Sequence, residues 1–184
     1  MLNKIVRGVI GITLIVQSVY AIDSSKELCK HDVLNLEAKN KVETVQHKKA
    51  ISELGKVLLA GNAADCKLIK DNYKSEGWVL IDARNKSSRA ATGVFKGTAK
   101  ITSDHSKPDK HQFTEKKLTK KLTKFFKKRG ESTDLKSKRL MLFCNGLKCY
   151  RSTWAACDLK IMGYDSSNLY LILDGYPGLE KCLK

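Results

Sequence analysis

The fold of this chain is decided by a stretch that reads LMLFCNGLKCYRS, residues 140–152. Its first four residues form a continuous apolar run, which is typical of a strand covered on both faces in a parallel sheet. The residues from Ser152 to Met162 have helical composition and stop at Gly163, a good C-terminal cap. The stretch therefore predicts a buried strand, a turn that begins at Cys144, and the start of a helix.

Two further apolar runs extend this pattern. One covers Trp78 to Ile81, and the other covers Leu169 to Leu173, directly after the predicted helix. The order strand, helix, strand is a β-α-β unit, whose two strands run parallel. We therefore predict an α/β fold of three layers, with a mainly parallel central sheet flanked by helices.

The length of 184 residues suits one domain with appendages. Residues 22–47 are polar and charged, and we interpret them as an N-terminal extension, which leaves residues 48–184 as the domain. Ser52 can cap a helix that ends before Gly61, and a second short helix is expected from Ala63 to Asn72.

The N-terminus has the pattern of an export signal. Lys4 and Arg7 are followed by an almost unbroken apolar run, residues 8–19, which ends in Val19-Tyr20-Ala21. These features predict a signal peptide, residues 1–21, and an exported protein, periplasmic rather than secreted. A retained membrane anchor is the alternative, but the run is shorter than the roughly 20 residues that span a bilayer.

Six cysteines follow the predicted signal: Cys29, Cys66, Cys144, Cys149, Cys157 and Cys182. An even number suits disulfides in an oxidising compartment, although the sequence does not choose among the pairings. Some of them are equally well explained as small buried apolar residues. No C-x-x-C pair or histidine-rich set is present, so we expect neither a metal nor a cofactor.

Basic residues are concentrated in one segment. The formal net charge is +16, and Lys96 to Arg139 holds 15 lysines and arginines against five acids, a local net charge of +10. We interpret this segment as a basic insertion in the domain. Within it, Glu115 to Arg129 predicts a helix with one apolar stripe, made of Leu118, Leu122, Phe125 and Phe126.

The favoured interpretation of this helix is a surface helix whose stripe packs on the core. The alternative is that the segment from Lys96 to Arg139 binds an acidic protein or an anionic surface, an interaction that salt would weaken. We expect no specific nucleic acid.

Two loops can carry chemistry, because ligands of parallel sheets bind at the carboxyl ends of strands. The first reads Asp82-Ala83-Arg84, and the second runs from Cys144 to Ser152. A cysteine between a strand and a helix N-terminus faces backbone N–H groups that stabilise a thiolate, a persulfide or an oxyanion. A buried structural cysteine is the alternative. Cys144 and Cys149 could also bond to each other, as a redox-active pair or an inert staple.

These residues resemble the rhodanese domain from about Ile51 to the C-terminus. The matching motifs occur in the family's order: residues 79–84 look like its Asp-x-Arg element, 93–101 like its Gly-His-Ile-Pro-Gly-Ala stretch, 143–152 like its active-site loop, and 163–164 with 173–176 like its closing glycine element. The resemblance implies a rhodanese-like fold and a single-domain sulfurtransferase, which the signal at the N-terminus predicts to be exported.

The resemblance also implies roles for single residues. Cys144 is expected to take sulfane sulfur from a small anionic donor, thiosulfate or a persulfide, and to pass it to a thiol or another thiophilic acceptor. The sulfur substrate is expected to bind the rest of the loop: Asn145, Gly146, Leu147, Lys148, Cys149, Tyr150, Arg151 and Ser152. Asp82 and Arg84 are expected to organise the site rather than react.

Several residues depart from the family pattern. Six residues separate Cys144 from Arg151, more than in compact sulfurtransferase loops, although a subgroup with a Cys-Asn-Gly-x-x-Cys-x-Arg-Ser loop looks similar. The longer loop keeps open a thiol-disulfide or arsenate- or phosphate-type enzyme that uses Cys144 and Cys149. Val94 stands where the family has histidine and Tyr176 where it has a second glycine, so a non-catalytic basic binding protein is a further alternative.

Overall fold

The computed structural model describes residues 63–104, 107, 109–146, 149 and 151–184. Four strands form one sheet in the order β2-β1-β3-β4, and every pair of neighbours is parallel. Their bounds are β1 (Trp78–Asp82), β2 (Thr98–Lys100), β3 (Arg139–Phe143) and β4 (Leu169–Leu171). The prediction of an α/β fold with a parallel central sheet flanked by helices is confirmed.

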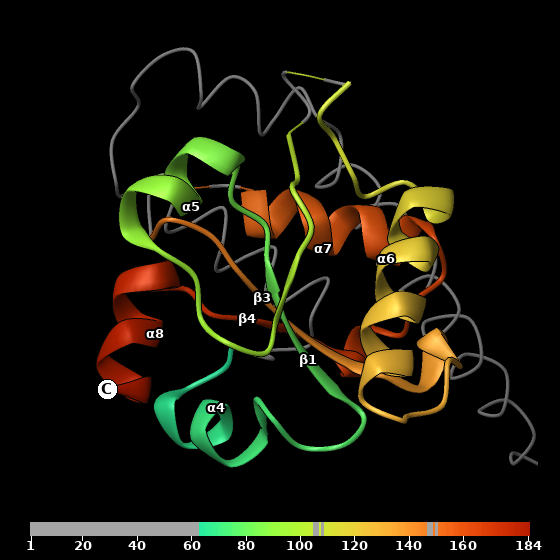
Figure 1. Cartoon of the computed structure of the whole chain (residues 1–184), viewed down its shortest axis with the longest axis horizontal. Helices are drawn as coiled ribbons and strands as arrows, with labels where there is room; N and C mark the ends of the chain where they lie inside the picture. The colour runs from blue at the N-terminus through green and yellow to red at the C-terminus, as the bar shows by residue number, and fades with distance from the viewer. Residues whose placement is uncertain (1–62, 105–106, 108, 147–148, 150) are drawn as a thin grey trace, which may run out of the picture.

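Helices cover both faces of this sheet (Figure 1). The described α-helices are α4 (Cys66–Asn72), α5 (Lys86–Thr92), α6 (Glu115–Lys128), α7 (Arg151–Ile161) and α8 (Gly175–Leu183). Short 3-10 turns, Leu135–Ser137 and Ser166–Asn168, precede β3 and β4. The core lies in two clusters, one on each face, because successive side chains of a strand point to opposite faces.

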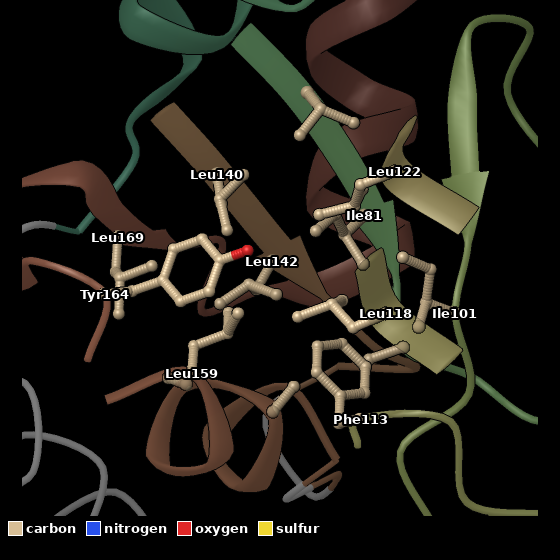
Figure 2. Close-up of a cluster of buried hydrophobic side chains, with 14 of the residues drawn as sticks. Ile81, Ile101, Phe113, Leu118, Leu122, Leu140, Leu142, Leu159, Tyr164 and Leu169 are labelled. Carbon is tan, nitrogen blue, oxygen red and sulfur yellow. The ribbon is translucent and has the colours of Figure 1, made fainter. Parts of the chain in front are cut away.

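The first cluster lies between the sheet and helices α6 and α7 (Figure 2). Leu118, Leu122 and Phe126 of α6 are at most 1% exposed, and they pack with Val79, Ile81, Leu140 and Leu142 of the sheet. Full burial of each such side chain stabilises the fold by roughly 1.5–3 kcal/mol. The favoured interpretation of the basic helix, with its apolar stripe on the core, is therefore confirmed.

The second cluster lies on the opposite face, under α4 and α8. Its buried members are Ile69, Trp78, Leu80, Met141, Phe143, Ile172, Leu179 and Cys182. A disulfide between Cys66 of α4 and Cys182 of α8, with Cα atoms 5.2 Å apart, joins the two helices. Successive residues of β1 and β3 thus belong alternately to the first and the second cluster. Both faces of these strands are buried, which explains why their apolar runs are continuous.

Two element boundaries differ from the sequence predictions, and two helices were not predicted. Helix α4 begins at Cys66 rather than Ala63, because the Asp65 carboxylate accepts from the Leu68 N–H and caps the helix, while Ala63 bridges to Leu171. Strand β4 ends at Leu171, since the Gly175 N–H donates to the Ile172 carbonyl and turns the chain into α8. Helices α5 and α8 were not predicted.

The basic segment, residues 96–139, is built into the described fold. It supplies β2, which pairs with β1, and α6, which covers the first cluster. The predicted signal peptide, the N-terminal extension and the helix after Ser52 lie outside the described residues. Among the described helices, none combines the length and apolarity needed to cross a membrane.

Candidate functional site

The two loops predicted to carry chemistry lie side by side. Asp82 and Phe143, the last residues of β1 and β3, are register partners, and the Ala83 N–H donates to the Phe143 carbonyl at 2.9 Å. Strand β2 lies on one side of β1, and the chain then crosses over so that β3 lies on the other side of β1. The carboxyl ends of β1 and β3 therefore form the topological switch point of the sheet, where α/β folds bind their ligands.

Cys144 follows β3 directly and forms a disulfide with Cys149. The two Cα atoms are 6.0 Å apart, and the Cys149 N–H donates to the Gly146 carbonyl at 2.9 Å, which closes the loop into a tight turn. Cys144 is 1% exposed, whereas Cys149 is partly exposed. The expected nucleophile is thus in its oxidised form, and any chemistry of its thiolate must begin with reduction.

Arg151, the first residue of α7, places a positive charge at this pair. Its Nη1 lies 4.0 Å from the Cys149 sulfur, and its Nη2 lies 3.7 Å from the Asp104 carboxylate. Asp104 is 3% exposed, so it holds the guanidinium from the protein side. A fixed cation next to a sulfur atom favours the thiolate over the thiol when the disulfide opens.

Asp82 and Arg84 form a fully buried ion pair beside the cysteine loop. The Arg84 Nη2 lies 2.6 Å from one Asp82 oxygen, and the Nε donates to the other at 2.9 Å. The same guanidinium donates to the Thr92 hydroxyl at 2.6 Å and to the Gly93 carbonyl at 2.9 Å. With its nitrogens committed to these groups, Arg84 holds the first loop against the residues that follow α5.

Tyr176 fastens the cysteine loop from the start of α8. Its N–H donates to the Cys144 carbonyl at 2.7 Å, its ring lies 4.2 Å from the Arg84 guanidinium, and its hydroxyl donates to the Thr92 carbonyl. Gly175 has φ +59°, and a Cβ atom there would lie 2.6 Å from the Cys144 carbonyl oxygen. Tyr176 and Gly175 therefore have a structural function in this chain, since they fix the position of the Cys144 carbonyl.

Arg89 of α5 was missed by the sequence analysis. Its guanidinium donates to the backbone carbonyls of Asp82 and Arg84 and to the Thr102 hydroxyl, so it ties the first loop to the residues after β2. Burial lowers the pKa of this guanidinium. No sequence signal distinguishes Arg89 from the other basic residues of the chain.

A buried polar chain lies behind Arg151. The Asp104 N–H donates to Nδ1 of His111 at 3.1 Å, and Nε2 of the same ring lies 3.4 Å from an Asp158 carboxylate oxygen on α7. These three residues are at most 8% exposed. His111 thus fixes Asp104, which holds Arg151, and Asp158 connects this group to α7.

The other predicted loop residues divide into two groups. Asn145 donates its amide N–H to the Ser88 hydroxyl at 3.1 Å, Gly146 has φ +141°, and Ser152 is buried on α7. Leu147, Lys148 and Tyr150 lie outside the described residues. The Cys149 amide donates to the Gly146 carbonyl, so it does not belong to the predicted cradle of backbone amides around the Cys144 sulfur. For the other amides of the loop, the cradle stays a prediction.

Within the described residues, no group of histidine, cysteine and carboxylate side chains is arranged to hold a metal ion.

The comparisons with known proteins leave the family open. No family model matches the chain, and no curated protein matches it. Among solved structures, the chain is similar to the BH2092 protein from Bacillus halodurans, with 19% identity over 73% of this chain and 80% of that chain and a TM-score of 0.46.

Proposed function

We propose that this protein is a sulfurtransferase that carries sulfane sulfur on Cys144. The observation that supports this most is the position of Cys144 at the switch point between β1 and β3, where its loop leads into α7. The rhodanese-like order of motifs supports the same chemistry. The donor is a small anion such as thiosulfate, or a persulfide, and the acceptor is a thiol or another thiophilic nucleophile.

The reaction begins once a dithiol has reduced the Cys144–Cys149 disulfide. The Cys144 thiolate attacks the outer sulfur of thiosulfate, the bond between the two thiosulfate sulfurs breaks, and sulfite leaves with the electron pair. Cys144 is then a persulfide. An acceptor nucleophile takes the outer sulfur and restores the Cys144 thiolate, so that one sulfur atom has moved and no net oxidation of the protein has occurred.

Export to an oxidising compartment, the periplasm, belongs to the same proposal. Two disulfides between described cysteines, Cys66–Cys182 and Cys144–Cys149, support it, because disulfides persist outside the reducing cytosol.

The test is thiosulfate:cyanide turnover by the reduced protein, beside Cys144→Ser and Cys149→Ser variants. We expect Cys144→Ser to abolish turnover and the protein persulfide seen by mass spectrometry, while Cys149→Ser keeps both. Persulfide formation that is undiminished in Cys144→Ser would refute the proposal.

A second candidate, a thiol-disulfide oxidoreductase, is favoured by the Cys144–Cys149 disulfide itself. This activity needs both cysteines and no sulfane sulfur. Reduction of a protein disulfide by the reduced chain, lost equally in Cys144→Ser and Cys149→Ser, would favour it over the sulfurtransferase.

A further inference from the structure

We propose that Cys149 is the sulfur-releasing partner of Cys144: it attacks the Cys144 persulfide and liberates hydrosulfide. This inference rests on the proposed function: it keeps the first half-reaction, and in the second half-reaction Cys149 takes the place of the external acceptor. The structural basis is the Cys144–Cys149 disulfide, which requires the Cys149 sulfur to reach Sγ of Cys144 within the folded loop. In a persulfide, that same Sγ carries the outer sulfur, so the attacking group and its target are already within bonding reach.

The step balances without an added oxidant. The Cys149 sulfur forms a bond to Sγ of Cys144, the bond from Sγ to the outer sulfur breaks, and the outer sulfur leaves with the electron pair. It takes the proton that Cys149 gives up and departs as hydrosulfide. The outer sulfur is reduced, the two cysteine sulfurs are oxidised to the disulfide, and the product is the loop seen in the structure.

Arg151 is placed to make Cys149 the attacking thiolate. Its Nη1 is 4.0 Å from the Cys149 sulfur, and the buried Asp104 holds its Nη2 at 3.7 Å. Because only the thiolate is a nucleophile, a cation fixed at this position increases the reactive fraction of Cys149. Arg151 is therefore a positioning residue for the release step rather than a group that takes part in it.

The difference in exposure between the two sulfurs indicates how the cycle closes. Cys144 is 1% exposed and Cys149 is partly exposed, so an external reductant reaches the Cys149 sulfur first. A dithiol then forms a mixed disulfide with Cys149, expels the Cys144 thiolate, and leaves as its own disulfide in a second exchange. The overall activity is reduction of sulfane sulfur to hydrosulfide, with a dithiol as the source of electrons.

The experiment follows one turnover. The protein is reduced, freed of reductant and mixed with excess thiosulfate, after which sulfite, hydrosulfide and the state of Cys144 are measured. In the wild-type protein, hydrosulfide should match sulfite, and the loop disulfide should form again. In Cys149→Ser, sulfite should appear with a stable Cys144 persulfide, and hydrosulfide release should slow at least tenfold.

The matched control is the double variant Cys66→Ser/Cys182→Ser, which removes the other pair of described cysteines. Once circular dichroism has verified that it is folded under the assay conditions, it should release hydrosulfide like the wild-type protein. Sulfite and a lasting persulfide in the wild-type protein, without hydrosulfide, would overturn the inference and leave the proposed function standing. No sulfite from any variant that retains Cys144 would overturn the proposed function itself.

The role of Arg151 has its own readout, the pH profile of hydrosulfide release. Arg151→Met should move the rise of this rate to higher pH, whereas Arg151→Lys should restore part of the difference. Sulfite formation, which depends on Cys144, should change less than hydrosulfide release. An unshifted profile in Arg151→Met would limit Arg151 to a structural role.

Discussion

The two disulfides whose cysteines both lie in the described part of the chain share one chemistry but differ in span and in position. Cys66 and Cys182 are 116 residues apart in the sequence and join α4 to α8 on one face of the sheet. Cys144 and Cys149 are five residues apart, within a single loop at the carboxyl ends of the strands. The first closes nearly the whole described fold, and the second closes only a turn.

This difference in span predicts different energetics. In the chain-entropy model, a bond across 116 residues stabilises the folded state by about 5 kcal/mol, and one across five residues by about 2 kcal/mol. Cys182 is also buried in the second core cluster, whereas Cys149 is partly exposed next to a cation. The long-range bond is therefore suited to stability, and the short-range bond is suited to being opened and closed.

The largest expected effect tests whether the Cys66–Cys182 disulfide contributes more to stability than the Cys144–Cys149 disulfide. Replacing both Cys66 and Cys182 by serine should lower the free energy of unfolding by about 4–5 kcal/mol, because the unfolded chain regains its freedom. The matched variant Cys144→Ser/Cys149→Ser should lose about 2 kcal/mol or less. Denaturant unfolding of the oxidised proteins measures both. Equal losses in the free energy of unfolding would show that the Cys144–Cys149 disulfide also serves mainly to stabilise the fold.

The second effect concerns the support beneath the loop. Gly175→Ala should cost about 2–4 kcal/mol, because alanine at φ +59° is strained and its Cβ would press on the Cys144 carbonyl at 2.6 Å. It should also displace the Cys144–Cys149 loop and change how readily a dithiol reduces that disulfide. The control is Gly130→Ala, since Gly130 has φ +71° but nothing within 4 Å of its Cβ position.

For Gly130→Ala we expect a cost of only about 1–2 kcal/mol and an unchanged rate of loop reduction. If Gly175→Ala reduced stability no more than Gly130→Ala, the close packing of α8 on the cysteine loop would not hold in solution. Dithiol titration followed by thiol counting measures the loop, and thermal unfolding measures the fold.

The sequence predicted those features of the fold and of the candidate site that depend on local pattern. The runs at β1 and β3 are continuous because both faces of these strands are buried, and parallel pairing then brings Asp82 and Cys144 to one edge. Strand β2 has no such run: of Thr98, Ala99 and Lys100 only Ala99 is buried, as befits an edge strand. Its presence follows from pairing with β1, which no local pattern reveals.

The parts that escaped prediction depend on contacts between distant residues. The pairing of Cys66 with Cys182 requires α4 and α8 to dock on the same face, and the sequence contains no sign of that docking. Likewise, Asp104 was only one of five acids in a basic segment until the fold placed it 3.7 Å from Arg151. Side chains that converge from separate elements are fixed by the tertiary structure alone.

The smallest expected effect sets the pH range in which the two disulfides can be compared, since thiol chemistry is probed at alkaline pH. Burial raises the pKa of Tyr164 from 10.0 to about 12, and Figure 2 shows its hydroxyl pointing in among Leu140 and Leu142. Between these values the unfolded chain loses the tyrosine proton while the folded chain keeps it. Stability from this group is thus complete below about pH 10 and is lost as pH rises toward 12.

The wild-type protein should lose on the order of 1 kcal/mol more than Tyr164→Phe between about pH 9 and about pH 11, measured by urea unfolding of both. Parallel losses in the two proteins would mean that Tyr164 ionises as freely in the folded protein as in the unfolded chain.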